Sequence, residues 1–174
     1  MTNTIACVEE ADVILITGSN TTENHPVLSA GVKRAVASGR ARLIVVDPRR
    51  IKIAEFAETY LRPNLGTDVA WINGMMHVII KENLHDKQFV EDRTENFEAL
   101  KAVVEKYTPE HVETITGIPA QQLMDAARLY AGGGVGSILY CMGITQHTSG
   151  TDNVKSLANL AMLCGNLGMR GGGV

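Results

Sequence analysis

The stretch DVILITGSNTTENH, residues 12–25, decides the fold that we expect for this chain of 174 residues. Residues 13–16 form a short apolar run of the kind that a buried parallel strand requires. Gly18, Ser19 and Asn20 follow, and such small residues form turns whose backbone can lie close to a ligand. Asn24 or a preceding threonine can then cap a helix that begins near Pro26. A strand, a small-residue loop and a helix start predict a phosphate-binding turn, although the pattern is not the G-x-G-x-x-G of NAD-binding proteins.

Composition limits the classes of protein that the chain can represent. Hydrophobic residues make up 45% and charged residues 20%, which is typical of one soluble globular domain. The net charge of -3 argues against nucleic acid as a partner. No apolar run reaches the ~20 residues of a membrane span, and the first residues do not form a signal peptide, so we expect a cytoplasmic protein. The three cysteines form no C-x-x-C pair, which indicates free thiols in a reducing compartment.

The rest of the chain repeats the alternation of strand and helix. The apolar runs at 42–46, 59–61 and 137–141 predict three further strands, and helices are predicted at 26–38, 69–82 and 152–164. The helix at 69–82 is apolar nearly all round, which predicts burial between layers. Shorter amphipathic segments fill the middle of the chain. We therefore expect one α/β domain over residues 1–174, a Rossmann-like, open, mostly parallel sheet flanked by helices, with a helical insertion at about 84–134.

Four of the predicted loops follow strands and carry polar motifs: GSNTTENH, DPRR, RPNLGTD and MGITQH. In an open parallel sheet, ligands bind beyond the carboxyl ends of the strands, so these loops are expected to share one edge. Ser19 and Asn20, with the helix start, can hold a pyrophosphate. Asp47 ends the second strand, where an acidic residue commonly accepts hydrogen bonds from a ribose.

The same loops offer groups for a phosphate and a base. Arg49 or Arg50 can bind a phosphate through two parallel hydrogen bonds. Asp68 can accept hydrogen bonds from the N–H groups of a guanine edge. Structural roles are open for both carboxylates, since Asp47 also fits a strand-ending turn and Asp68 an ordinary helix N-cap. His77 lies inside the apolar helix and is interpreted as a core residue.

No arrangement of residues in the sequence predicts catalysis or a metal site. The chain has no H-E-x-x-H, no P-loop and no G-x-S-x-G motif, and Cys7, Cys141 and Cys164 lie far apart. A nucleotide site without reacting groups indicates either a binding module or a part of a larger enzyme.

Eight motifs in order support the second interpretation. GSNTTENHPV, LIVVDPRR, RPNLGTDVAWINGMMHVIIKENL, FVEDRTENFEAL, YTPEHVETITGIP, AARLYA, MGITQHTSGTDNVKSLANLAMLCGNLG and GGGV together resemble molybdopterin oxidoreductases of the dimethyl sulfoxide reductase type. The likeness is greatest to the catalytic α subunit of formate dehydrogenases. It implies that the chain is the third of four domains and holds one guanosine half of a bis-molybdopterin guanine dinucleotide cofactor.

The resemblance also implies a set of cofactor contacts in the four loops. These contacts fall on Gly18, Ser19, Asn20, Glu23, His25, Asp47, Arg49, Gly66, Asp68, Met142, Gly143 and Gln146. The first five residues lie in the first loop. Asp47 and Arg49 are expected to contact the ribose or guanine and the nearby phosphate, and Gly66 and Asp68 to contact the guanine side. The last three are expected beside the pterin.

Other parts of such an enzyme are expected outside this sequence. The cysteines of its 4Fe-4S cluster and the ligand to molybdenum or tungsten would lie upstream, and the arginine that assists formate oxidation downstream. We therefore expect the chain alone to be inactive, to hold no cofactor by itself, and to work with the other domains and with electron-transfer subunits of the parent. Two alternatives are the same domain of a nitrate reductase and a stand-alone nucleotide-binding module. Because neighbouring domains would cover part of its surface around residues 71–80, the isolated chain is also expected to self-associate.

Overall fold

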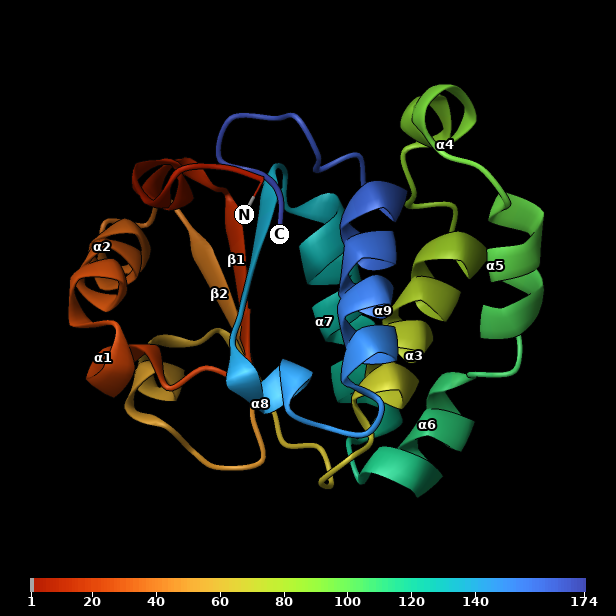
Figure 1. Ribbon diagram of the computed structural model, residues 1–174, viewed down its shortest axis with the longest axis horizontal. Helices are drawn as coiled ribbons and strands as arrows, with labels where there is room; N and C mark the ends of the chain where they lie inside the picture. Colours follow the sequence, from red (N-terminus) through yellow and green to blue (C-terminus); the bar gives the residue numbers. More distant parts are fainter. Residues whose placement is uncertain (1) are drawn as a thin grey trace.

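A parallel sheet forms the centre of the computed structural model, which describes residues 2–174. Within these residues the sheet has four strands in the order β3-β2-β1-β4 (Figure 1). The strands are β1 (Val13–Thr17), β2 (Arg42–Val46), β3 (Thr59–Leu61) and β4 (Gly136–Tyr140). All neighbouring strands run parallel, and β1 is paired along its whole length with β2 on one side and β4 on the other. The predicted α/β fold with a mostly parallel sheet is confirmed.

The apolar run of β1 is buried on both faces of the sheet. Val13 and Leu15 belong to a large cluster on one face, whereas Ile14 and Ile16 belong to a smaller cluster on the other. None of the four side chains has exposed area. Successive strand residues point to opposite faces, so an uninterrupted apolar run is what a central strand needs.

Helices cover both faces of the sheet. The described helices are α1 (Thr21–Asn24), α2 (Pro26–Ala37), α3 (Asp68–Lys81), α4 (Lys87–Arg93), α5 (Phe97–Val104), α6 (Pro109–Thr116), α7 (Ala120–Gly132), α8 (Met142–Thr145) and α9 (Gly150–Leu163), with 3-10 helices η1 (Ile5–Glu10) and η2 (Lys52–Phe56). In Figure 1, α1 and α2 lie on one side of the sheet, and α7, α9 and α3 lie on the other. The predicted helix over 26–38 corresponds to α2, but neither Asn24 nor a threonine caps it. His25 is the N-cap residue, without a side-chain hydrogen bond, because α1 occupies residues 21–24.

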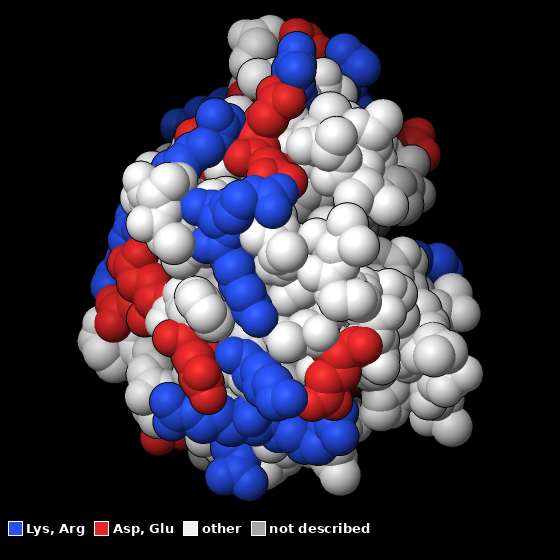
Figure 2. Space-filling view, turned by 90° about the vertical axis from the view of Figure 1, so that its left-hand side faces the viewer, with Lys and Arg blue, Asp and Glu red and all other residues white. Residues whose placement is uncertain are grey.

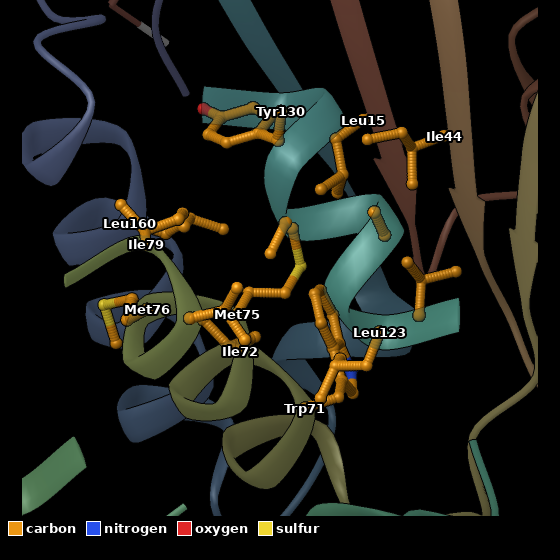
Figure 3. Close-up of a cluster of buried hydrophobic side chains, with 14 of the residues drawn as sticks. Leu15, Ile44, Trp71, Ile72, Met75, Met76, Ile79, Leu123, Tyr130 and Leu160 are labelled. Carbon is orange, nitrogen blue, oxygen red and sulfur yellow. The ribbon is translucent and has the colours of Figure 1, made fainter. Parts of the chain in front are cut away.

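The apolar helix α3 is enclosed by its own chain. Trp71, Ile72, Met75, Met76 and Ile79 have no exposed side-chain area and pack among residues of α6, α7 and α9 (Figure 3). The prediction that this helix is buried between layers is therefore confirmed. The expectation that residues 71–80 present an exposed surface in the isolated chain is wrong, because helices of the same chain already cover them.

His77, on α3, is a core residue, as interpreted from the sequence. Its exposed fraction is 9%, and its Nδ1 atom lies 3.0 Å from the carbonyl oxygen of Val104 in α5. This contact fixes α5 against α3.

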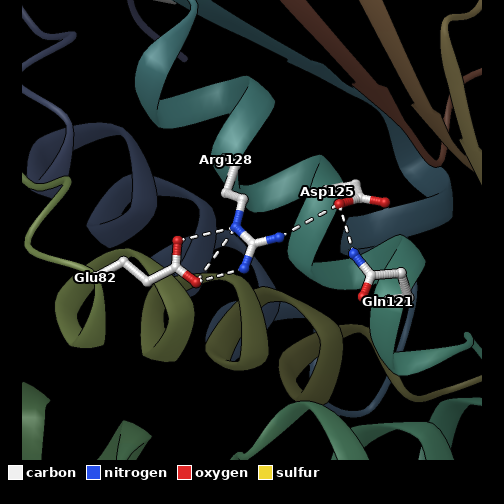
Figure 4. A network of polar contacts seen from close by, with 4 residues as sticks. All are labelled: Glu82, Gln121, Asp125 and Arg128. Carbon is white, nitrogen blue, oxygen red and sulfur yellow. Dashed lines mark hydrogen bonds and ion pairs between the residues drawn. The ribbon is translucent and has the colours of Figure 1, made fainter.

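The middle of the chain contains α4 to α7. Figure 1 shows α4, α5 and α6 on the outer side of α3, whereas α7 lies between α3 and the sheet. Arg128 of α7 binds the carboxylate of Glu82, just after α3, through Nε at 2.9 Å and Nη2 at 2.7 Å, and it also contacts Asp125 (Figure 4). This exposed ion pair joins the two helices at their surface, where such pairs contribute at most about 1 kcal/mol.

The last described residues return to the sheet. Gly173 forms a parallel bridge with Ser137 of β4, and its carbonyl accepts a hydrogen bond from the Ile138 N–H at 2.8 Å. The Asn166 side chain stabilises the start of β4: it accepts a hydrogen bond from the Gly136 N–H at 2.8 Å and donates one to the Tyr130 hydroxyl at 3.2 Å. Within residues 2–174, no helix has the length and apolar character needed to cross a membrane.

Candidate functional site

The four loops that follow the strands meet at one edge of the sheet. Thr17, at the end of β1, is in register with Val46 of β2 and with Tyr140 of β4, and Val46 is in register with Leu61 of β3. The loops after these residues therefore begin at the same level. The order of the strands places the switch in winding direction between β1 and β4, which is where open α/β sheets bind ligands.

The loops after β1 and β4 touch through two glycines. The Gly143 N–H donates to the Gly18 carbonyl at 3.0 Å. A Cβ atom on Gly18 would lie 2.7 Å from the backbone of Gly143, and Gly18 has a φ of 56°. Only glycine allows both the left-handed backbone and this close approach.

The first loop continues into the short helix α1. Ser19 is buried, and the Asn20 side chain donates to the Glu23 carboxylate at 2.8 Å. Glu23 also pairs with Lys52 of η2 at 3.3 Å, and these two partners lower the pKa of the exposed Glu23 carboxyl. Asn20 Oδ1 and Thr21 Oγ1 are buried without a hydrogen-bond partner among the described residues. Buried polar atoms are usually hydrogen-bonded, so these two oxygens are exceptions within the described residues.

The second loop places a buried carboxylate at the end of β2. Asp47 is 5% exposed and accepts a hydrogen bond from the Arg49 N–H at 2.8 Å. Burial raises the pKa of the Asp47 carboxyl, although the hydrogen bond and the charge of Arg49 oppose this effect. The negative charge of Asp68 adds a smaller contribution in the same direction.

The third loop ends at Asp68, where α3 begins. Asp68 is the first helical residue and Thr67 the N-cap residue. The Trp71 Nε1–H donates to Asp68 Oδ1 at 3.3 Å, and the other carboxylate oxygen has no such bond within the described chain. Gly66 is exposed with a φ of 76°, and a Cβ atom there would meet nothing within 4 Å.

Arginines surround the ends of β2 and β3. Arg49, Arg50 and Arg62 are exposed, and none of them makes an ion pair with a carboxylate of residues 2–174. Figure 2 shows Lys and Arg side chains gathered at the lower end of this side of the molecule, the end at which the strands of Figure 1 finish. A hollow of about 670 Å³ opens here, and its lining residues are Pro48, Arg49, Arg62, Pro63, Asn64, Leu65 and Gly117. Unpaired guanidinium groups beside a hollow attract phosphate.

The fourth loop forms α8, a short helix that the sequence does not predict. Met142 and Gly143 lie on it and Gln146 directly follows it, and all three residues are exposed. Asn153, at the start of α9, holds this helix by donating to the Ile144 carbonyl at 2.9 Å, and its own Oδ1 is buried without a partner among the described residues.

His25 and Cys141 come from different loops and lie together. Their Nε2 and Sγ atoms are 3.9 Å apart. His25 was among the predicted contacts, whereas Cys141 was interpreted only as a free thiol. Thr21 and Asn153 were also missed, since their residue types occur throughout the chain and only their burial distinguishes them.

The edge of the sheet therefore offers a polar surface suited to a nucleotide. The carboxylates of Asp47 and Asp68 can accept hydrogen bonds, and the three exposed arginines can bind phosphate. Buried oxygens of Asn20, Thr21 and Asn153 without a hydrogen-bond partner among the described residues lie behind this edge. Among residues 2–174, no three His, Cys, Asp or Glu side chains are grouped to hold a metal ion.

Comparison with known proteins identifies the family of this chain. The family model for molybdopterin oxidoreductases matches residues 1–174. The chain is 50% identical over 174 residues to the F420-dependent formate dehydrogenase subunit alpha of Methanocaldococcus jannaschii, of which it covers 26%, and 44% identical over 174 residues to formate dehydrogenase H of Escherichia coli, of which it covers 24%. Among solved structures, 93% of the chain superposes on 24% of the acetylene hydratase from Pelobacter acetylenicus, with a TM-score of 0.85 and 31% identity. The chain spans about a quarter of the length of the curated relatives it matches.

Proposed function

Because this chain belongs to the molybdopterin oxidoreductase family, we propose that it is the third domain of a formate dehydrogenase catalytic α subunit and binds one guanosine half of a bis-molybdopterin guanine dinucleotide cofactor. The observation that carries the proposal is that Asp47 and Asp68 follow the adjacent parallel strands β2 and β3, where exposed arginines make no ion pair with a carboxylate of residues 2–174. Carboxylates can accept from the hydroxyls of a ribose and the N–H groups of guanine, but adenine presents a different edge.

Each loop has a distinct task in this proposal. Asp47 accepts from a ribose hydroxyl, Asp68 accepts from guanine, and Arg49 binds a phosphate. Gly18, Ser19, Asn20, Glu23, His25 and Gly66 complete the nucleotide pocket, and Met142, Gly143 and Gln146 face the pterin. When bound, the metal pterin supplies the two-electron oxidation of formate to carbon dioxide, whereas the residues of this chain bind and orient it.

The other components of the reaction belong to the rest of the parent protein in this proposal. The molybdenum or tungsten ligand and the 4Fe-4S cluster lie in other domains, because Cys7, Cys141 and Cys164 form no ligand motif. The domain works with these parts and with electron-transfer subunits in the cytoplasm, and the chain alone does not oxidise formate.

Calorimetric titration of the 174-residue chain with GDP and ADP tests the nucleotide site. We expect GDP to bind more tightly, and Asp68→Ala to weaken GDP binding about tenfold or more while leaving ADP binding nearly unchanged, since a hydrogen bond to a charged group is worth about 1.5–3 kcal/mol. Asp92→Ala is the matched control, because Asp92 is exposed on α4, away from the strand ends. Equal binding of GDP and ADP would exclude the guanine role of Asp68. Failure of both nucleotides to bind would mean that the site needs the neighbouring domains of the parent protein, as the expectation that the chain alone holds no cofactor implies.

A further inference from the structure

A cavity of about 410 Å³ opens beside the carboxyl half of β4. Cys141, His25 and Thr21 line it together with the last described residues of the chain. The Cys141 thiol is partly exposed, and His25 Nε2 lies 3.9 Å from its sulfur. A small molecule in this cavity can therefore approach the Cys141 sulfur beside the His25 imidazole.

We propose that Cys141 is a reactive thiol, activated by His25, which small electrophiles and hydrogen peroxide modify selectively. An imidazole nitrogen in contact with a thiol can accept its proton as the sulfur attacks an electrophile, so that the sulfur reacts as the thiolate, which is the nucleophilic form. The proposal does not depend on the cofactor assignment, because it needs only the contact between these two side chains.

Thr21 provides an independent sign that this cavity receives a polar group. The residue is 1% exposed, and its Oγ1 is buried without a hydrogen-bond partner among the described residues, although it lies in the lining of the cavity. Such a hydroxyl keeps an unused hydrogen-bond donor in the wall of the cavity.

The other two cysteines lack this combination. Burial raises the pKa of the Cys164 thiol to about 12. Cys7 Sγ shares a hydrogen bond of 3.0 Å with Thr4, and the nearby Arg170 guanidinium is occupied by the Glu10 carboxylate. Neither sulfur faces a histidine nitrogen, within residues 2–174, as Cys141 does.

The oxidation step balances with peroxide as the only co-reactant. The Cys141 thiolate attacks one oxygen of hydrogen peroxide, so that an S–O bond forms as the O–O bond breaks. The sulfur loses two electrons and becomes a sulfenic acid, and the leaving hydroxide takes the proton held by His25 to become water. An alkylating reagent such as a maleimide instead accepts the thiolate at its double bond and a proton from solvent.

Brief labelling of the chain with N-ethylmaleimide, followed by peptide mass spectrometry, measures the three thiols in one sample. We expect Cys141 to react first, and His25→Gln to slow it about tenfold or more at neutral pH, since general bases contribute at least this factor. His147→Gln is the matched control: it removes another histidine of the same edge, whose Nε2 contacts the Gly143 carbonyl at 2.9 Å and not the thiol. Treatment with hydrogen peroxide and then dimedone should mark Cys141 alone.

Two results would overturn the proposal. One is labelling of Cys7 at least as fast as Cys141 in the unaltered chain, a comparison that needs no variant. The other is an unchanged Cys141 rate in His25→Gln when circular dichroism shows a folded chain. If that variant does not fold, His25→Asn is measured in its place, with the same criterion.

Discussion

Replacing Gly18 by alanine tests the contact that joins the loops after β1 and β4. The new Cβ would lie 2.7 Å from Gly143 C and from Ile144 N, which are backbone atoms that no rotamer change can move away. Gly39 provides the matched control. It also has a positive φ, 74° against 56° for Gly18, but a Cβ atom there meets nothing within 4 Å.

Comparing the two glycines separates the loss of unfolding free energy into a backbone-strain part and an overpacking part. Both alanines carry the left-handed backbone penalty of about 1–2 kcal/mol, and both gain similarly from a less flexible unfolded chain. Only Gly18→Ala adds overpacking, which costs about 1–3 kcal/mol. We therefore expect the Gly18 variant to lose about 1–3 kcal/mol more of its unfolding free energy than the Gly39 variant. Gly143→Ala should show the overpacking part alone, since its backbone is ordinary and its Cβ would lie 2.7 Å from Gly18 Cα.

Urea denaturation followed by circular dichroism measures these differences, with the slopes compared to confirm that only stability has changed. Equal losses in the Gly18 and Gly39 variants would refute the reasoning, because they would mean that the two loops separate without cost. A loss in Gly143→Ala as small as that of an ordinary surface substitution would lead to the same conclusion.

Three further variants test individual contacts. Asp47→Asn should gain stability relative to the original chain as the pH rises from 3 to 7. Burial raises the pKa of the Asp47 carboxyl in the folded state, so the original chain loses stability as the pH rises through that pKa, whereas the variant does not. Melting temperatures across this range check the sign, and the same substitution should weaken GDP binding. Asn166→Ala should cost about 1–3 kcal/mol in urea unfolding, since it leaves the buried Gly136 N–H without an acceptor, and a loss below about 0.5 kcal/mol would show that another group satisfies it. Arg128→Ala should cost no more than about 1 kcal/mol, and less at high salt, because its pair with Glu82 is exposed; a salt-independent loss would indicate packing instead.

The strands were predictable because their burial is a local property of the sequence. Residues 13–16 are apolar without interruption, and only a central parallel strand requires this. The short helices α1 and α8 were not predictable, because four residues are too few to show a helical period. The exposure of residues 71–80 was wrongly predicted, since their cover depends on how α5 to α7 and α9 fold back over α3.

The candidate site also has features that the sequence predicts and features that it does not. Parallel topology alone predicts that the loops after the strands share an edge, and residue chemistry marks Asp47, Asp68 and Arg49 within them. The position of Asp68 relative to Asp47 depends on where the chain returns after β3, which no sequence pattern reveals. Thr21 and Asn153 stand out only through unsatisfied oxygen atoms, a property of the packed state.

The contacts between the loops have a consequence for the thermodynamics of binding. The Gly143 N–H donates to the Gly18 carbonyl, Lys52 pairs with Glu23, and the Tyr60 hydroxyl donates to the Asp47 carbonyl at 2.9 Å. The loops after β1, β2 and β4 are thus each held by another part of the chain. Their conformational freedom is already lost when the protein folds. A ligand that binds at this edge does not have to order mobile loops. The entropy cost that opposes its binding enthalpy therefore comes mainly from the ligand's own loss of translational and rotational freedom.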